Sequence, residues 1–158
     1  MYTQEEAKQL RLNFWEQFGR RCSVHPQLKF RHKNFILHRT KVSGVALRFE
    51  ADRNGARVIL ELGQRNEEKR LKAYEILLRY KVIIEENFPE GLIWEFYHQR
   101  EDSGQEVCRI YSELTDADIH RQNQWPDIFN FFIENMIRLE ENFLQVRDIL
   151  IEEMDAHS

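Results

Sequence analysis

The chain has 158 residues, a mass of 19.3 kDa and a formal net charge of −4, and this length suits one domain, residues 1–158, with a sizeable core. Its 42% hydrophobic content, with only 6 Gly and 3 Pro, excludes an intrinsically disordered chain. No apolar run reaches the roughly 18 residues that a membrane span needs, and the polar, acidic N-terminus is unlike a signal peptide. Two cysteines are too few for a disulfide framework. We therefore expect a cytoplasmic protein with no membrane contact.

The first predicted element is a helix near the N-terminus. Thr3 and Glu6 have the spacing of a capping box, in which each side chain accepts a hydrogen bond from the other residue's backbone amide. Pro26 disfavours helical geometry in the residue before it, which predicts that the helix ends between residues 21 and 25. Apolar residues recur at helical spacing within it: Leu10, Phe14, Trp15 and Phe18.

A basic segment spans residues 17–49, which contain no Asp or Glu, whereas residues 127–158 hold eight acidic and two basic side chains. Lysine and arginine displace counterions from phosphates, so one interpretation is that the segment binds nucleic acid. The other interpretation is that it pairs with the acidic C-terminal region, within the chain or across a dimer. The candidate binding residues are Arg20, Arg21, Lys29, Arg31, Lys33, Arg39 and Lys41.

Two hairpins are predicted, with a long helix between them. Apolar and polar residues alternate over 45–52 and 57–62 on both sides of an Asn54-Gly55 turn, and a second pair of strands is expected over 92–99 and 106–114. Asn66 is a suitable N-cap for a helix that we expect to run to Asn87. The face expected under the helices carries Val45, Leu47, Phe49, Val58, Leu60, Leu62, Leu92, Trp94 and Phe96. The other face is expected to carry Arg48, Glu50, Arg57, Ile59, Glu61, Glu95, Tyr97, Arg109 and Tyr111.

The last predicted element is a helix over residues 125–154 that is apolar on more than one side. Either it is wrapped by the other helices or it pairs with a second copy as a homodimer, in which case a charge at Phe143 should reduce the dimer. The order helix, hairpin, helix, hairpin, helix predicts an α+β fold with three long helices. Its antiparallel sheet has four strands, or five if residues 35–37 form a short strand.

The segment from Lys81 to Glu95, KVIIEENFPEGLIWE, resembles a recurrent element of a bacterial family of domains of unknown function, family 4268. That family runs a Lys-x-x-Ile-Glu helix end into a turn and a Leu-x-Trp-Glu strand, and the resemblance covers nearly the whole chain. The sequence departs from it at Pro89, where a glycine-like turn residue is expected, although Gly91 lies close by. The resemblance implies no catalytic residues. It implies a weak association with DNA-related biology, because family members occur alone or fused to nuclease-like, defence-related domains.

Three sets of side chains in the sequence have residue types that could carry chemistry. A restriction-type nuclease would use Asp52 and Glu61 to hold Mg²⁺, but Gly63 stands where such enzymes have a lysine. Four potential zinc ligands match no standard finger spacing, so we assign no metal and no cofactor: Cys22, His25, His32 and His38. Cys108 alternates with its strand neighbours in a way typical of a small buried hydrophobe.

Lys81 and Glu85, four residues apart, either form a partly buried ion pair, with Glu95 or an arginine, or line a cleft beside Trp94. With no catalytic residue assigned, we expect a non-catalytic binding or assembly module for nucleic acid or a protein partner. The alternatives are a degenerate metal-dependent nuclease-like hydrolase and a structural homodimer held by the C-terminal helix.

Overall fold

The computed structural model describes residues 2–28 and 40–156, and its elements follow the predicted order. The four strands form one antiparallel sheet in the order β1-β2-β4-β3, which confirms the α+β class; residues 35–37 lie outside the described ranges. The elements are α1 (Gln4–Ser23), β1 (Val45–Asp52), β2 (Gly55–Leu62), α2 (Glu67–Arg79), α3 (Lys81–Ile84), β3 (Ile93–Gln99), β4 (Glu106–Leu114), η1 (Gln122–Gln124) and α4 (Trp125–Asp155).

The helix caps are largely those that the sequence predicts. The amide of Glu6 donates to Thr3 Oγ1 at 3.1 Å and the amide of Thr3 donates to Glu6 Oε1 at 3.3 Å, which completes the capping box of α1. Asn66 Oδ1 accepts from the amide of Lys69 at 3.0 Å at the start of α2. The prediction of one continuous helix from Asn66 to Asn87 is wrong. Tyr80, at φ −105° and ψ 26°, separates α2 from α3.

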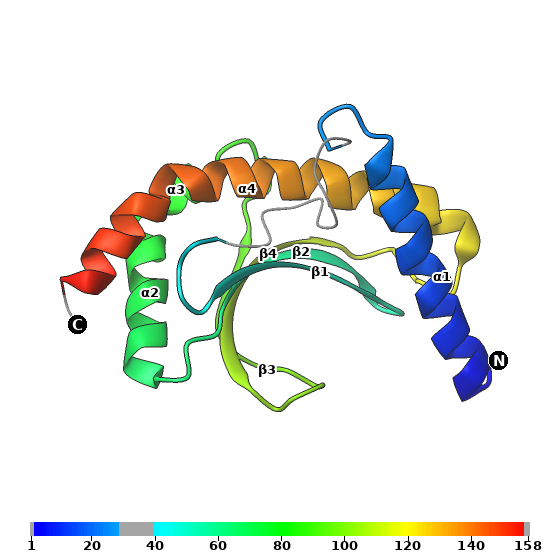
Figure 1. Ribbon diagram of the computed structural model, residues 1–158, viewed down its shortest axis with the longest axis horizontal. Helices are drawn as coiled ribbons and strands as arrows, with labels where there is room; N and C mark the ends of the chain where they lie inside the picture. Colours follow the sequence, from blue (N-terminus) through cyan, green and yellow to red (C-terminus); the bar gives the residue numbers. More distant parts are fainter. Residues whose placement is uncertain (1, 29–39, 157–158) are drawn as a thin grey trace.

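The helices lie on one side of the sheet (Figure 1). α4 crosses that side, while α1 and α2 descend at the two ends of the molecule, and no helix of the described residues covers the opposite side. The sheet curves so that its uncovered side is concave. We call this uncovered side of the sheet the open face. No helix within residues 2–28 and 40–156 has the length and apolar character that a membrane crossing requires.

Aromatic rings join α1, β1 and α4 in the core. Phe132 is fully buried, and its ring centroid lies 4.8 Å from that of Phe49 on β1 and 5.2 Å from that of Phe18 on α1. Most other apolar side chains of α4, including Phe143 at 0% exposure, are also buried within the chain. The core therefore accounts for the apolar character of this helix, and a charge at Phe143 would test folding rather than a dimer.

A β-bulge interrupts the alternation of β3. Glu95 pairs with Arg109 and His98 pairs with Val107, so that Phe96 and Tyr97 together lie opposite Cys108. The prediction that Phe96 belongs to the covered core is wrong, since its side chain is 65% exposed. The bulge has no signature in the period-two pattern, which is why the sequence does not reveal it.

Candidate functional site

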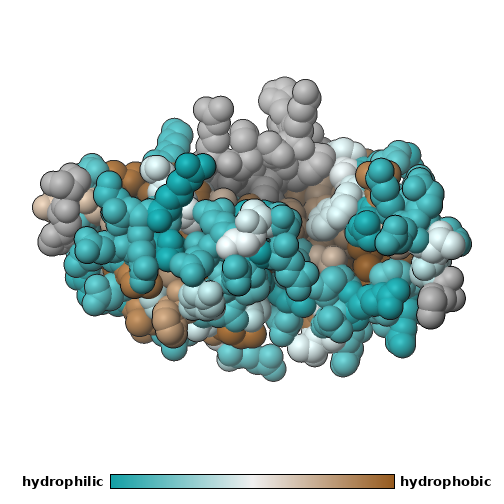
Figure 2. All heavy atoms as spheres, turned by 90° about the horizontal axis from the view of Figure 1, so that it is seen from below, coloured by the Kyte–Doolittle hydropathy of each residue, from teal (hydrophilic) through white to brown (hydrophobic). Residues whose placement is uncertain are grey.

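The open face is predominantly hydrophilic (Figure 2). Strand alternation and register place its side chains: pairing of Glu50 with Arg57, and of Arg57 with Glu113, aligns three charged residues across β1, β2 and β4. Because this side is concave, long side chains converge and bury one another although none of the helices that the structure describes covers them. Arg57 is only 9% exposed, Glu61 8% and Arg109 4%.

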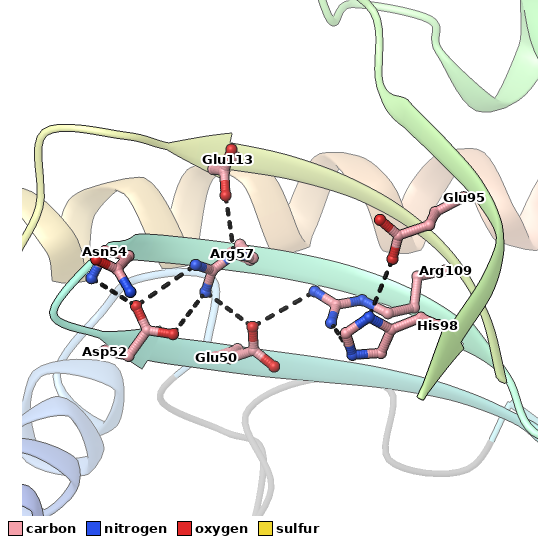
Figure 3. A network of polar contacts seen from close by, with 8 residues as sticks. All are labelled: Glu50, Asp52, Asn54, Arg57, Glu95, His98, Arg109 and Glu113. Carbon is pink, nitrogen blue, oxygen red and sulfur yellow. Dashed lines mark hydrogen bonds and ion pairs between the residues drawn. The ribbon is translucent and has the colours of Figure 1, made fainter. Parts of the chain in front are cut away.

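Arg57 is the centre of one half of this charged network (Figure 3). Its Nε donates to Glu113 Oε2 at 2.9 Å, and its Nη1 donates to Glu50 Oε1 at 2.8 Å and to Asp52 Oδ2 at 3.2 Å. Burial lowers the pKa of the Arg57 guanidinium, but the hydrogen bond and charge of Asp52, with those of Glu50 and Glu113, raise the pKa above its ordinary value overall. Arg57 is therefore a permanent cation held by three carboxylates.

Arg109 is the centre of the other half. Its Nη1 lies 2.7 Å from His98 Nε2, its Nη2 donates to Glu50 Oε1 at 3.4 Å, and its guanidinium carbon lies 4.8 Å from the ring centroid of Tyr111. A guanidinium cannot accept a hydrogen bond, so His98 Nε2 is the acceptor, and His98 Nδ1 lies 3.2 Å from Glu95 Oε1. The Nε of Arg109 is buried and has no hydrogen-bond partner among the described residues.

The structure does not bring Asp52 and Glu61 together. Glu61 lies opposite Ala46, six positions from Asp52 along β1, which separates the two by roughly 20 Å at about 3.3 Å per residue. Each is also paired with arginine: Asp52 with Arg57 at 3.2 Å, and Glu61 with Arg48 at 3.2 Å. No group of three or more His, Cys, Asp or Glu residues suited to a metal ion occurs within the described ranges.

The described members of the basic set lie at two ends of α4. Arg20 pairs with Glu16 on its own helix, and Arg21 Nη2 donates to Asn130 Oδ1 at 2.5 Å, near the start of α4. Lys41 lines a groove with Met154, 24 residues further along α4, or roughly 35 Å at 1.5 Å per residue. The other members lie outside the described residues: Lys29, Arg31, Lys33 and Arg39.

The set Lys81, Glu85, Trp94 and Glu95 does not line one cleft. Glu85 Oε2 accepts from the backbone amide of Leu92 at 2.7 Å and from the indole Nε1 of Trp94 at 2.9 Å, so this carboxylate fastens the end of α3 to β3. Glu95, the next residue on the strand, points to the open face, and Lys81 is exposed on α3. Gly91 has φ +72°, in the left-handed region that favours glycine, and lies beside the Glu85 carboxylate in the turn between α3 and β3.

We predict that Glu85→Ala lowers the free energy of unfolding by about 1–3 kcal/mol, because it leaves the Leu92 amide and the Trp94 indole without their acceptor. Urea unfolding followed by circular dichroism measures the change. Glu86→Ala, at the exposed neighbouring side chain, is the matched control and should change stability by less than about 0.5 kcal/mol. Equal losses in both variants would contradict the structural role of Glu85.

The two cysteines lie in the core. Cys22 is 1% exposed, and burial, only partly opposed by the charge of Arg21, raises the pKa of its thiol to about 12. Cys108 is 0% exposed, burial raises the pKa of its thiol as well, and its Sγ donates to the carbonyl of Phe96 at 3.0 Å. Both thiols therefore remain protonated near neutral pH, which suits packing rather than metal ligation or nucleophilic attack. His32 and His38 lie outside the described residues.

The sequence locates several members of the network without revealing it as a site. Alternation predicts that Glu50, Arg57 and Arg109 share a face, but it does not single out His98 or Glu113. Glu113 becomes a partner of Arg57 only through the pairing of β2 with β4, and His98 faces Arg109 only because of the bulge in β3. The sequence offers one signal for the network, which is the presence of opposite charges on strands that are predicted to be neighbours.

These features define an α+β domain whose antiparallel sheet is covered by helices on one side and carries a partly buried ionic network on the other. The chain belongs to the family described as a domain of unknown function, DUF4268, whose sequence model matches residues 10–147. The family resemblance of the Lys81–Glu95 segment is thereby confirmed. No curated protein and no solved structure matches the chain.

Proposed function

We propose that this protein is a non-catalytic binding module that takes a protein partner on the open face of its sheet. The observation that carries the proposal is Arg109, which is 4% exposed and has a buried Nε donor without a partner within the described ranges. Buried donors are almost always satisfied, so a carbonyl or carboxylate oxygen of a bound partner would complete this one.

The composition of the open face supports a protein partner. Arginine and tyrosine are enriched at protein interfaces, and Arg57, Arg109 and Tyr111 are at most 9% exposed here. Replacing buried ion pairs by apolar residues is often neutral or stabilising, so such a network is weakly explained by stability alone. Recognition of a partner's polar groups would account for the presence of this ionic network.

The charge of the open face argues against nucleic acid on that side. Its arginines are matched by carboxylates, whereas phosphate binding favours a surface that is basic throughout. Arg21 and Lys41, at opposite ends of α4, add no single basic patch to it. The separation of Asp52 from Glu61 likewise gives the nuclease-like alternative no support.

Site-specific photo-crosslinking in cells tests the proposal. A photoreactive residue at position 50 on the open face should capture one protein species, and the same residue at the exposed position 134 on α4 should not. With purified proteins, Glu50→Gln should weaken binding of the captured protein about tenfold or more, and Glu134→Gln should leave it unchanged.

Fluorescence anisotropy with labelled DNA and RNA, at low and physiological salt, tests the competing interpretation. Binding that falls steeply with salt, is lost in Arg31→Glu with Lys33→Glu, and is accompanied by no protein crosslink from position 50 would overturn the proposal. It would favour the basic segment as a nucleic-acid surface.

A further inference from the structure

A cavity of about 590 Å³ lies where α2, the C-terminal part of α4 and the segment before β1 meet, at one end of the molecule (Figure 1). It is the groove that holds Lys41 and Met154, and we call it the lysine pocket. None of the residues that line it belongs to the charged network of the open face (Figure 3). Its volume lies within the range of about 300–1,000 Å³ that is typical of sites for small molecules.

Three lysines line the pocket and form no ion pair within the described ranges. Lys69 and Lys72 are three residues apart on α2 and are therefore neighbours on its surface, and Lys41 comes from the segment before β1. Arg70, beside Lys69 in the chain, pairs instead with Glu106 at 3.6 Å. The pocket therefore gathers cations that the described part of the chain leaves without an ion pair.

Hydrogen bonds hold the wall of the pocket in place and leave one acceptor unused. Thr40 Oγ1 donates to the carbonyl of Val45 at 2.8 Å, which holds the turn that carries Lys41. Gln64 Nε2 donates to the carbonyl of Ser43 at 3.2 Å, and the buried Oε1 of the same amide has no hydrogen-bond partner among the described residues. Because buried polar groups are almost always satisfied, a hydroxyl or N–H group of a bound molecule would complete this one.

We propose that the lysine pocket binds a mononucleotide, a function beyond the one proposed for the open face. Three ammonium groups suit a phosphate with two negative charges, since lysine binds phosphate as a point charge. Ile151 and Met154 supply apolar surface against which the faces of a base pack. Glu68 and Asp155, which also line the pocket, are carboxylates that accept hydrogen bonds from ribose hydroxyls. A bare anion would be repelled by both carboxylates and would leave the apolar side chains uncovered.

Isothermal titration calorimetry with the whole chain tests the proposal. AMP, GMP, CMP and UMP are titrated in turn, and each is compared with its own nucleoside and with inorganic phosphate. At least one mononucleotide should bind with a Kd of about 100 µM or tighter, and at least about tenfold more tightly than its nucleoside or phosphate alone. If none of the four binds at about 5 mM, or if inorganic phosphate binds equally well, the proposal is overturned.

Substitutions of the lysines test whether the mononucleotide occupies this pocket. Lys41→Ala and Lys72→Ala should each raise its Kd at least about fivefold, because each removes one positive charge from the phosphate. Lys8→Ala, at an exposed lysine of α1, is the matched control and should leave the Kd unchanged. Circular dichroism confirms that each variant is folded. A Kd that stays the same in all three variants would overturn the assignment of this pocket.

The end of a nucleic-acid strand carries the same chemistry as a free mononucleotide, and a short oligonucleotide separates the two. A single strand of about six nucleotides that ends in the preferred nucleotide should bind no more tightly than that mononucleotide. A strand that binds at least about tenfold more tightly, and loses this advantage in Lys41→Ala, would overturn the proposal in favour of a nucleic-acid ligand.

Discussion

Arg57→Met is expected to lower the free energy of unfolding by about 2–4 kcal/mol. The substitution keeps much of the side-chain volume but removes the cation that Glu50, Asp52 and Glu113 share within 3.2 Å. Three carboxylates would then face one another on the concave side of the sheet. The loss is expected near the lower end of the range for a buried pair, because the Glu50 and Asp52 side chains are 41% and 47% exposed and are partly screened by water.

Urea unfolding followed by circular dichroism measures this loss, since urea, unlike guanidinium chloride, adds no ionic screening. Arg53→Met, in the exposed turn of the same hairpin, is the matched control and should change stability by less than about 0.5 kcal/mol. If both variants unfold at the same urea concentration, the network on the open face adds no net stability. Part of the Arg57→Met loss should be recovered in Arg57→Met with Glu113→Gln, because the second change removes one of the unpaired charges.

Phe132→Ala is expected to have the larger effect, a loss of about 3–5 kcal/mol. Its ring is fully buried and lies within 6.2 Å, between centroids, of aromatic rings from α1, β1 and α4 itself. Truncation would leave a cavity at the point where these elements meet, and the surrounding rings are too constrained to fill it. Thermal and urea unfolding measure the loss.

Leu144→Ala is the control for Phe132→Ala on the same helix. Leu144 is 39% exposed, so its truncation removes less buried surface than that of Phe132 and should cost about 1.5 kcal/mol or less. A loss below 1 kcal/mol for Phe132→Ala would mean that the aromatic cluster is not the centre of the core. Phe132→Leu, which keeps more of the volume, should fall between the two.

The sequence predicts the elements well because their signals are local. The capping box at Thr3, the N-cap Asn66 and the alternation on the first hairpin each depend on a few neighbouring residues, and the structure confirms them. The break at Tyr80 and the bulge at Phe96 escape prediction for a common reason. Each is a change of one residue in backbone conformation that leaves the apolar pattern on both sides intact.

The open face is harder to predict than the strands that form it. Alternation is enough to place Arg57 and Arg109 on one side, but their partners depend on which strands are neighbours. The sheet order puts β4 between β2 and β3, so Glu113 meets Arg57 across a pairing that local patterns do not specify. The curvature of the sheet then buries these side chains, and no single residue of the sequence indicates that curvature.

The pairing of β2 with β4 also bears on the order in which the chain is assembled. Each hairpin closes between adjacent strands, whereas Leu62 meets Cys108 only after the chain between them, with α2, α3 and β3, has been made and folded back. The contact of Arg57 with Glu113 joins β2 to β4 across this pairing. The Arg57–Glu113 ion pair therefore forms only in a chain that extends at least to Glu113 and whose β4 has folded back onto β2.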